Sequence, residues 1–181
     1  MLGPLPLKKA RIVVEVGPGT GAITKEILNR LPYDATLLAF EINPRFSRHL
    51  KSTVPDTRLS IVDTSAENLS EELERRGYDR VDAVVSSLAL GLMFAWQRRH
   101  FLAGVCSLLS DKGVFTQYQY VQSIQVMKNG HWKRFDLEKM LRRYFRSVQR
   151  KMIWRNLPPA FVFICKSPRP LTQELVEGEP C

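Results

Sequence analysis

Near-continuous apolar runs alternate along this chain with segments in which apolar residues recur every three or four positions. The runs are typical of strands buried on both faces, and the second spacing is typical of helices that bury one face. We expect strands at residues 11–16, 35–41, 58–62, 81–85 and 113–118, and helices at 22–31, 44–52, 67–76 and 92–109. Because strands and helices alternate strictly, the pattern predicts a parallel sheet with helices on both faces.

The alternation stops beyond residue 120. A longer segment leads to an amphipathic helix at 135–144, and two apolar strands, at 147–153 and 160–165, then follow with no helix between them. Two consecutive strands can pair antiparallel, so we expect an α/β sheet that is mostly parallel with an antiparallel last strand. One domain should span residues 1–167, and residues 168–181, which lack periodicity, should form a loose tail.

Length and charge narrow the class of protein. A chain of 181 residues fits one domain, and no apolar run approaches the ~18 residues of a membrane span. The N-terminus lacks the order of charges and the cleavage site of a signal peptide, which predicts a cytoplasmic protein. The net charge of +9 favours a polyanionic partner, and ten Lys or Arg lie between Lys128 and Arg155.

Cysteine and histidine do not point to a metal. The three cysteines are widely spaced with no C-x-x-C pair, and the three histidines share no ligand spacing. We therefore expect reduced, structural cysteines and no metal site.

Three alternating glycines follow the first predicted strand. In E-V-G-P-G-T-G-A-I, residues 15–23, they allow a tight turn and a close approach of the backbone to a ligand. Ligands of an open α/β sheet bind outside the carboxyl ends of its strands. Glu15 would repel a pyrophosphate at this loop, so the loop favours a nucleotide-type cofactor that carries positive charge.

Polar residues also follow the next three strands. Glu41, about twenty residues beyond the glycines, can accept both hydroxyl protons of a ribose. Asp63 can accept the exocyclic amine of an adenine, with Thr64 or Ser65 adding polar contacts, and Ser86 follows the fourth strand. The predicted cofactor contacts are Glu15, Gly17, Gly19, Thr20, Gly21, Glu41, Ile42, Asp63, Thr64 and Ser86.

From Ala10 to Lys166 these residues resemble class I S-adenosylmethionine-dependent methyltransferases. The resemblance implies a Rossmann-like, seven-stranded methyltransferase sheet and S-adenosyl-L-methionine as the cofactor. It also implies that the glycine loop lies near the methionine part, Glu41 on the ribose and Asp63 near the adenine.

Further motifs resemble bacterial and archaeal phospholipid N-methyltransferases, which convert phosphatidylethanolamine stepwise to phosphatidylcholine. They are E-V-G-P-G-T-G-A-I-T, A-F-E-I-N-P, V-V-S-S-L-A-L, K-G-V-F-T-Q-Y-Q-Y and W-R-N-L-P-P-A-F-V. Such proteins usually carry an N-terminal lid segment, and we expect this segment to be short or missing here. The implied acceptor-side residues are Ser87, Tyr118, Tyr120, Trp154, Arg155 and Asn156. Arg155 could pair with a lipid phosphate, and the two tyrosines could position a cationic head group.

Three functions stay open from the sequence. The first is a lipid amine methyltransferase that is peripheral on the inner membrane face and uses the basic segment 128–155 to reach anionic lipids. The second is an RNA methyltransferase of the rRNA adenine type. Charge supports it, but the N-L-P-Y motif of adenine methylation is missing after the fourth strand, where Ser86-Ser87-Leu88-Ala89 stands. The third is a non-catalytic module that binds S-adenosylmethionine.

Overall fold

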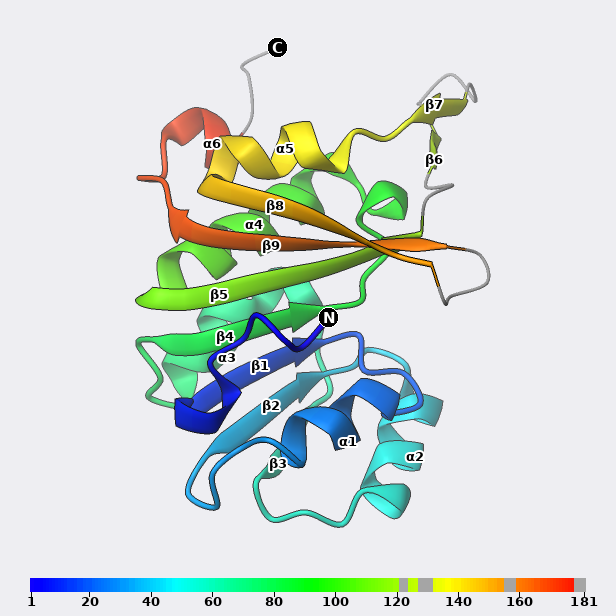
Figure 1. Cartoon of the computed structure of the whole chain (residues 1–181), viewed down its shortest axis with the longest axis vertical. Helices are drawn as coiled ribbons and strands as arrows, with labels where there is room; N and C mark the ends of the chain where they lie inside the picture. Colours follow the sequence, from blue (N-terminus) through cyan, green and yellow to red (C-terminus); the bar gives the residue numbers. More distant parts are fainter. Residues whose placement is uncertain (121–123, 127–131, 155–158, 178–181) are drawn as a thin grey trace.

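The computed structural model describes residues 1–120, 124–126, 132–154 and 159–177, and it gives only the backbone at 124–126, 132–134, 174 and 177. A seven-stranded sheet has the order β3-β2-β1-β4-β5-β9-β8 (Figure 1). Its strands are β1 (Ile12–Val16), β2 (Thr36–Phe40), β3 (Leu59–Val62), β4 (Val81–Ser86), β5 (Leu109–Tyr120), β8 (Phe145–Ile153) and β9 (Ala160–Pro168). The first five strands pair in parallel, and β9 lies antiparallel between β5 and β8. The predicted Rossmann-like fold is confirmed.

Helices, single 3₁₀ turns and a small ladder make up the other elements of the described ranges. The helices are α1 (Ala22–Leu28), α2 (Pro44–Thr53), α3 (Leu69–Arg75), α4 (Ala95–Leu108), α5 (Leu137–Tyr144) and α6 (Gln173–Glu177). Single 3₁₀ turns are η1 (Leu7–Lys9), η2 (Ala66–Asn68) and η3 (Leu90–Leu92). A separate two-stranded ladder pairs β6 (Ile124–Val126) with β7 (Trp132–Arg134), and β6 lies against η3.

Helices cover both faces of the sheet, as predicted. The face toward the viewer in Figure 1 packs against α1, α2 and the N-terminal residues, through buried side chains such as Leu5, Ile27 and Leu50. The opposite face packs against α3, α4, α5 and α6, through side chains such as Leu73, Phe101 and Leu141. The inner strands β1, β2 and β4 are therefore buried on both sides, which explains their near-continuous apolar sequences.

Some element ends differ from the sequence prediction. Helix α4 starts at Ala95 instead of residue 92, because η3 and an extended Phe94 precede it. Strand β5 begins at Leu109, directly after α4, and a register shift in its pairing with β4 accommodates the four added residues before Gly113. Helix α2 begins as predicted, with the Asn43 side chain accepting a hydrogen bond from the Arg45 N–H.

The structure corrects the expectation of a loose tail for residues 169–177. Leu175 on α6 is buried in the core beside α4. Its carbonyl accepts a hydrogen bond of 2.9 Å from the Tyr144 hydroxyl, and the Arg169 N–H donates to the Tyr144 carbonyl at 2.7 Å. One apolar side chain and a buried hydroxyl therefore hold this segment, too little to show as periodicity in the sequence.

Candidate active site

The glycine loop connects β1 to α1 at the carboxyl edge of the sheet. Gly19 and Gly21 both have left-handed backbone conformations, with φ of 57° and 82°. A Cβ on Gly21 would lie 2.5 Å from Leu50 Cδ2, whereas a Cβ on Gly19 would meet nothing within 4 Å. Gly21 is therefore needed for packing of the loop on α2, whereas Gly19 gives the loop a left-handed turn at a position where a side chain would meet open space.

Glu41 connects this loop to the end of β2. Its Oε2 accepts a hydrogen bond of 3.1 Å from the Gly19 N–H, and its Oε1 accepts one of 2.8 Å from the Asn43 N–H. The residue is buried. Each carboxylate oxygen has two acceptor positions, so one on each oxygen is left for a ligand such as a ribose diol.

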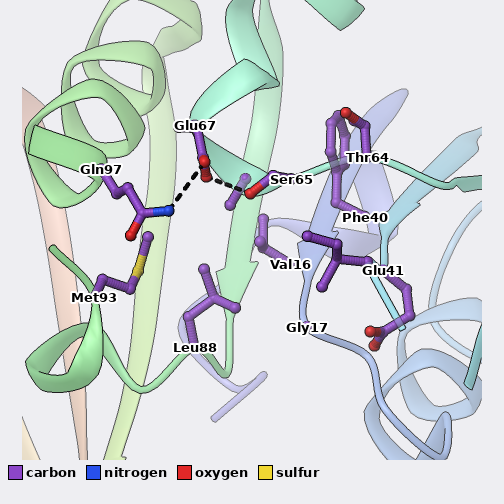
Figure 2. Close-up of a pocket in the computed structure, with 12 residues that line it drawn as sticks. Val16, Gly17, Phe40, Glu41, Thr64, Ser65, Glu67, Leu88, Met93 and Gln97 are labelled. Atoms are coloured by element: carbon purple, nitrogen blue, oxygen red, sulfur yellow. Dashed lines mark hydrogen bonds between the residues drawn. The ribbon is translucent and has the colours of Figure 1, made fainter. Parts of the chain in front are cut away.

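A cleft of about 170 Å³ opens beside Glu41 (Figure 2). Its apolar walls come from opposite sides, with Phe40 on the β2 side and Leu88 and Met93 on the β4 side. Such an arrangement can hold a flat heteroaromatic ring between apolar surfaces, with polar groups at one end to select it. The lining residues are Val16, Gly17, Phe40, Glu41, Ile42, Thr64, Ser65, Ala66, Glu67, Leu88, Met93 and Gln97.

Glu67 and Gln97 are the polar pair that the sequence analysis missed. Glu67 accepts hydrogen bonds from the Ser65 hydroxyl and, at 3.1 Å, from Gln97 Nε2 (Figure 2). Partial burial opposes ionisation of Glu67, but these hydrogen bonds prevail and hold its pKa below the usual value. Glu67 is therefore an ionised acceptor at the wall of the cleft, suited to the exocyclic amine of a base.

Asp63 is placed differently from the prediction. It accepts a hydrogen bond from the Ser47 hydroxyl and forms a 3.0 Å ion pair with Lys51, both on α2. These contacts lower the pKa of Asp63, the Ser47 hydrogen bond most. Asp63 does not line the cleft, whereas the next two residues, Thr64 and Ser65, do. The strand end thus directs its first carboxylate to α2 and the following side chains to the cleft.

Glu15 is a fully buried carboxyl group at the end of β1. Among the described residues, neither of its oxygens has a hydrogen-bond partner, and the nearby Thr24 hydroxyl on α1 is also buried without one. Burial raises the pKa of Glu15 to about 7, with the Thr24 hydroxyl acting in the opposite direction. A cationic group next to the glycine loop would stabilise the ionised form, as expected for the ammonium group of a bound methionine moiety.

The predicted acceptor-side tyrosines lie on β5, outside the cleft lining. The rings of Tyr118 and Tyr120 meet edge to face, with centroids 5.1 Å apart, and their backbone positions pair with Val162 and Ala160 of β9. Arg155 and Asn156 lie outside the described residues.

Ser86 ends β4, and Ser87 follows it directly. The Ser86 hydroxyl is buried and accepts a hydrogen bond from the Leu88 N–H at 3.3 Å, while the Ser87 N–H donates to the Val16 carbonyl at 3.0 Å. Of the other predicted contacts, Ile42 lines the cleft and Thr20 is exposed on the loop. In the described ranges no helix is long and apolar enough to cross a bilayer.

Comparison with known proteins identifies the family. The family described as "Methyltransferase domain" matches residues 13–113. The ornithine lipid N-methyltransferase of Singulisphaera acidiphila is 31% identical over 163 residues, which cover 90% of this chain and 79% of that protein. The ribosomal RNA small subunit methyltransferase H of Aromatoleum aromaticum is also 31% identical, but over 86 residues, which cover 48% of this chain and 27% of that protein.

Solved structures share the fold. The N-methyltransferase NodS from Bradyrhizobium japonicum superimposes with a TM-score of 0.66 at 15% identity, covering 88% of this chain and 87% of NodS. A 1,6-didemethyltoxoflavin-N1-methyltransferase from Burkholderia thailandensis, solved with S-adenosylhomocysteine, gives 0.63 at 17% identity, covering 87% and 71%. The domain match spans more than half of the chain, and the glycine loop, Glu41 and the cleft fit the predicted cofactor. The chain belongs to the methyltransferase domain family and is a class I S-adenosylmethionine-dependent methyltransferase.

Proposed function

We propose that this enzyme transfers methyl groups to the amine of a membrane lipid, with phosphatidylethanolamine or a related amine lipid as the acceptor. The observation that carries the proposal is the relative named an ornithine lipid N-methyltransferase, since the match covers most of both chains. The net charge of +9 adds support, because an enzyme that works on lipid must approach an anionic surface.

The cleft suits the adenosine part of S-adenosylmethionine. Phe40, Leu88 and Met93 would enclose the adenine ring, Glu67 would accept from its amine, and Glu41 would accept from the ribose hydroxyls. This assignment replaces Asp63 with Glu67 as the adenine contact.

The methionine part would then lie along the glycine loop. There the buried Glu15 carboxyl group is close to Thr24 and has no hydrogen-bond partner among the described residues. An ammonium group nearby would offset the cost of burying a carboxylate without a hydrogen bond.

The chemistry asks for alignment more than for acid or base groups. S-adenosylmethionine supplies, when bound, an electrophilic methyl group on a sulfonium, whose sulfur leaves as a neutral thioether. The protein has to hold the amine in line with the methyl carbon and exclude water. Tyr118 and Tyr120 on β5, with Ser87, are the described residues that we propose on the acceptor side; Arg155 and Asn156 extend that proposal beyond the described residues.

A labelling experiment tests the proposal. The purified enzyme is incubated with methyl-labelled S-adenosylmethionine and, separately, with phosphatidylethanolamine vesicles, ornithine lipid vesicles and ribosomal RNA. We expect label in a lipid fraction and none in RNA. Glu41→Gln serves as the control, since it keeps the side-chain shape and removes the charge that we assign to ribose binding.

Two other results would replace the proposal. Label in RNA alone would favour the ribosomal RNA methyltransferase function, to which the partial relative and the positive charge point. Cofactor binding by calorimetry, with no label in either lipid or in RNA, would favour a binding module.

A further inference from the structure

Exposed large hydrophobic side chains gather at the carboxyl edge of the sheet. Parallel strands β1 to β5 all end at this edge, at the right of Figure 1, and β8 ends there too because it is antiparallel to β9. Of the ten such side chains in the described ranges, eight follow or end these strands, and only Tyr33 and Leu171 lie at the opposite edge. The eight are Ile42, Phe46, Leu92, Phe94, Trp96, Tyr120, Met152 and Trp154.

The most exposed cluster is at the turn from η3 into α4. Leu92 is 71% exposed, Phe94 72% and Trp96 49%, within five residues of chain. The turn is firmly built, since the Phe94 N–H donates to Gln97 Oε1 at 3.1 Å and the buried Arg98 guanidinium donates to the Met93 and Leu90 carbonyls. A hydrogen-bonded turn that exposes Leu, Phe and Trp together is typical of an interaction surface.

The same turn borders the cofactor cleft. Met93, between the two exposed residues, lines the cleft, and so does Gln97 one helical turn later (Figure 2). On the other side of the cleft, Ile42 is 71% exposed as well. A surface that covered these side chains would therefore lie over the mouth of the cleft.

Charge on the same edge favours an anionic partner. Exposed Arg45 and Arg48 lie on α2, just after Ile42 in the chain, and exposed Lys151 lies near the end of β8. Arg150 is exposed next to Lys151, but it already forms an ion pair of 3.3 Å with Glu138 on α5. Tryptophan and tyrosine beside basic side chains are the combination found at the water interface of bilayers.

From these observations we propose that the carboxyl edge is a membrane-docking face, with Leu92, Phe94 and Trp96 as an insertion turn that enters an anionic bilayer. This inference rests on the proposed function and extends it, because docking in this orientation would bring the cleft to the level of the lipid head groups. Membrane binding through the apolar side chains should persist at high salt, whereas salt should screen the contribution of the arginines and lysines.

Vesicle partitioning tests the docking face. The full chain is sedimented with vesicles of phosphatidylcholine containing phosphatidylglycerol. We expect Leu92→Ser with Phe94→Ser to lower the partition coefficient about tenfold or more. The matched control is Tyr33→Ser with Leu171→Ser, which removes two exposed hydrophobic side chains from the opposite edge and should change partitioning less than about twofold. Equal effects of the two pairs would overturn the proposal.

Fluorescence gives a second measurement that does not depend on these variants. With Trp132→Phe and Trp154→Phe, the remaining Trp96 should shift to shorter wavelength on vesicles and be quenched by brominated lipid. Absence of quenching in vesicle-bound protein would overturn the proposal. The Leu92 and Phe94 variant could instead lose a self-association that wild type shows in size-exclusion chromatography, while its vesicle binding stays unchanged. That result would assign the surface to a second copy of the chain.

The docking face and the proposed function can fail separately. Methylation of lipid by both wild type and the Leu92 and Phe94 variant, with equal vesicle binding, would refute the docking face alone. Quenching of Trp96 by lipid without methylation of any lipid amine would refute the acceptor alone. If the docking face and the lipid acceptor are both correct, the Leu92 and Phe94 variant should lose turnover on vesicles. It should retain turnover on a short-chain lipid amine that is dispersed as monomers.

Discussion

The Glu41 carboxylate accepts a hydrogen bond of 3.1 Å from the Gly19 N–H, which joins the end of β2 to the glycine loop after β1. The same side chain accepts from Asn43 N–H at 2.8 Å, so it fixes the loop and the start of α2 together. One side chain thereby sets the distance between the two parts of the cofactor site.

We expect Glu41→Gln to weaken S-adenosylmethionine binding about 10- to 100-fold, because a charged acceptor is lost at the ribose position. Calorimetric titration measures this change in Kd. The thermal transition of the variant is measured as well and should fall, because the amide oxygen of Gln can accept from only one of the two backbone N–H groups. The titration is therefore run well below that transition. An unchanged Kd would remove Glu41 from the ribose site.

Gly19 and Gly21 should respond differently to alanine. Gly21→Ala places a Cβ 2.5 Å from Leu50 Cδ2 at a positive φ, and we expect about 2 to 4 kcal/mol of lost stability. Gly19→Ala meets open space, so it should cost only about 1 kcal/mol for its φ while lowering cofactor affinity. Urea unfolding of both variants, followed by titration with cofactor, separates the two roles. Equal losses of stability would contradict this distinction.

The fold could be predicted because burial leaves a strong mark on sequence. Strands β1, β2 and β4 are covered on both faces and read as Val, Leu and Ala runs, while Asn43 and Pro44 mark the start of α2. Segment 169–177 was missed because, among its described side chains, Leu175 is the one buried apolar anchor, and its other contacts include hydrogen bonds with Tyr144. A single buried side chain has no periodicity.

The site was only partly predictable for a different reason. Glu41 and the glycines follow strand ends, and that position in sequence determines their place at the carboxyl edge. Asp63 also follows a strand, but its carboxylate contacts Ser47 and Lys51 on α2 and does not line the cleft. Gln97 reaches the cleft from α4, about thirty residues from its partner Glu67, and such a contact between helices has no local signature.

Asp63 and Glu67 offer a direct comparison of two carboxylates. We expect Glu67→Gln to raise the Kd for S-adenosylmethionine about tenfold, because the adenine amine loses a charged acceptor. Asp63→Asn should leave the Kd within about twofold and cost no more than about 1 kcal/mol of stability, since its ion pair with Lys51 is largely exposed. Titration of both variants under one set of conditions gives the comparison. A larger effect of Asp63→Asn would restore Asp63 as the adenine contact.

Glu15 should make the stability of the cofactor-free protein depend on pH. Its pKa is raised from 4.5 to about 7, first because burial disfavours the carboxylate. The folded state therefore binds the proton more tightly than the unfolded state, and the free energy of unfolding falls as pH rises from about 4.5 to 7. Above pH 7 the folded protein bears the full cost of ionising the buried Glu15, which is about 3 kcal/mol from the shift in pKa.

Glu15→Gln isolates this contribution, because it keeps a similar shape and cannot ionise. Urea unfolding of wild type and variant at pH 5 and pH 8 should show the variant gaining about 2 to 3 kcal/mol relative to wild type between the two. Saturating S-adenosylmethionine should shrink this gain, since an ammonium near the glycine loop would stabilise the ionised carboxylate of wild type. A stability difference that does not change with pH would contradict the raised pKa of Glu15 in the folded state.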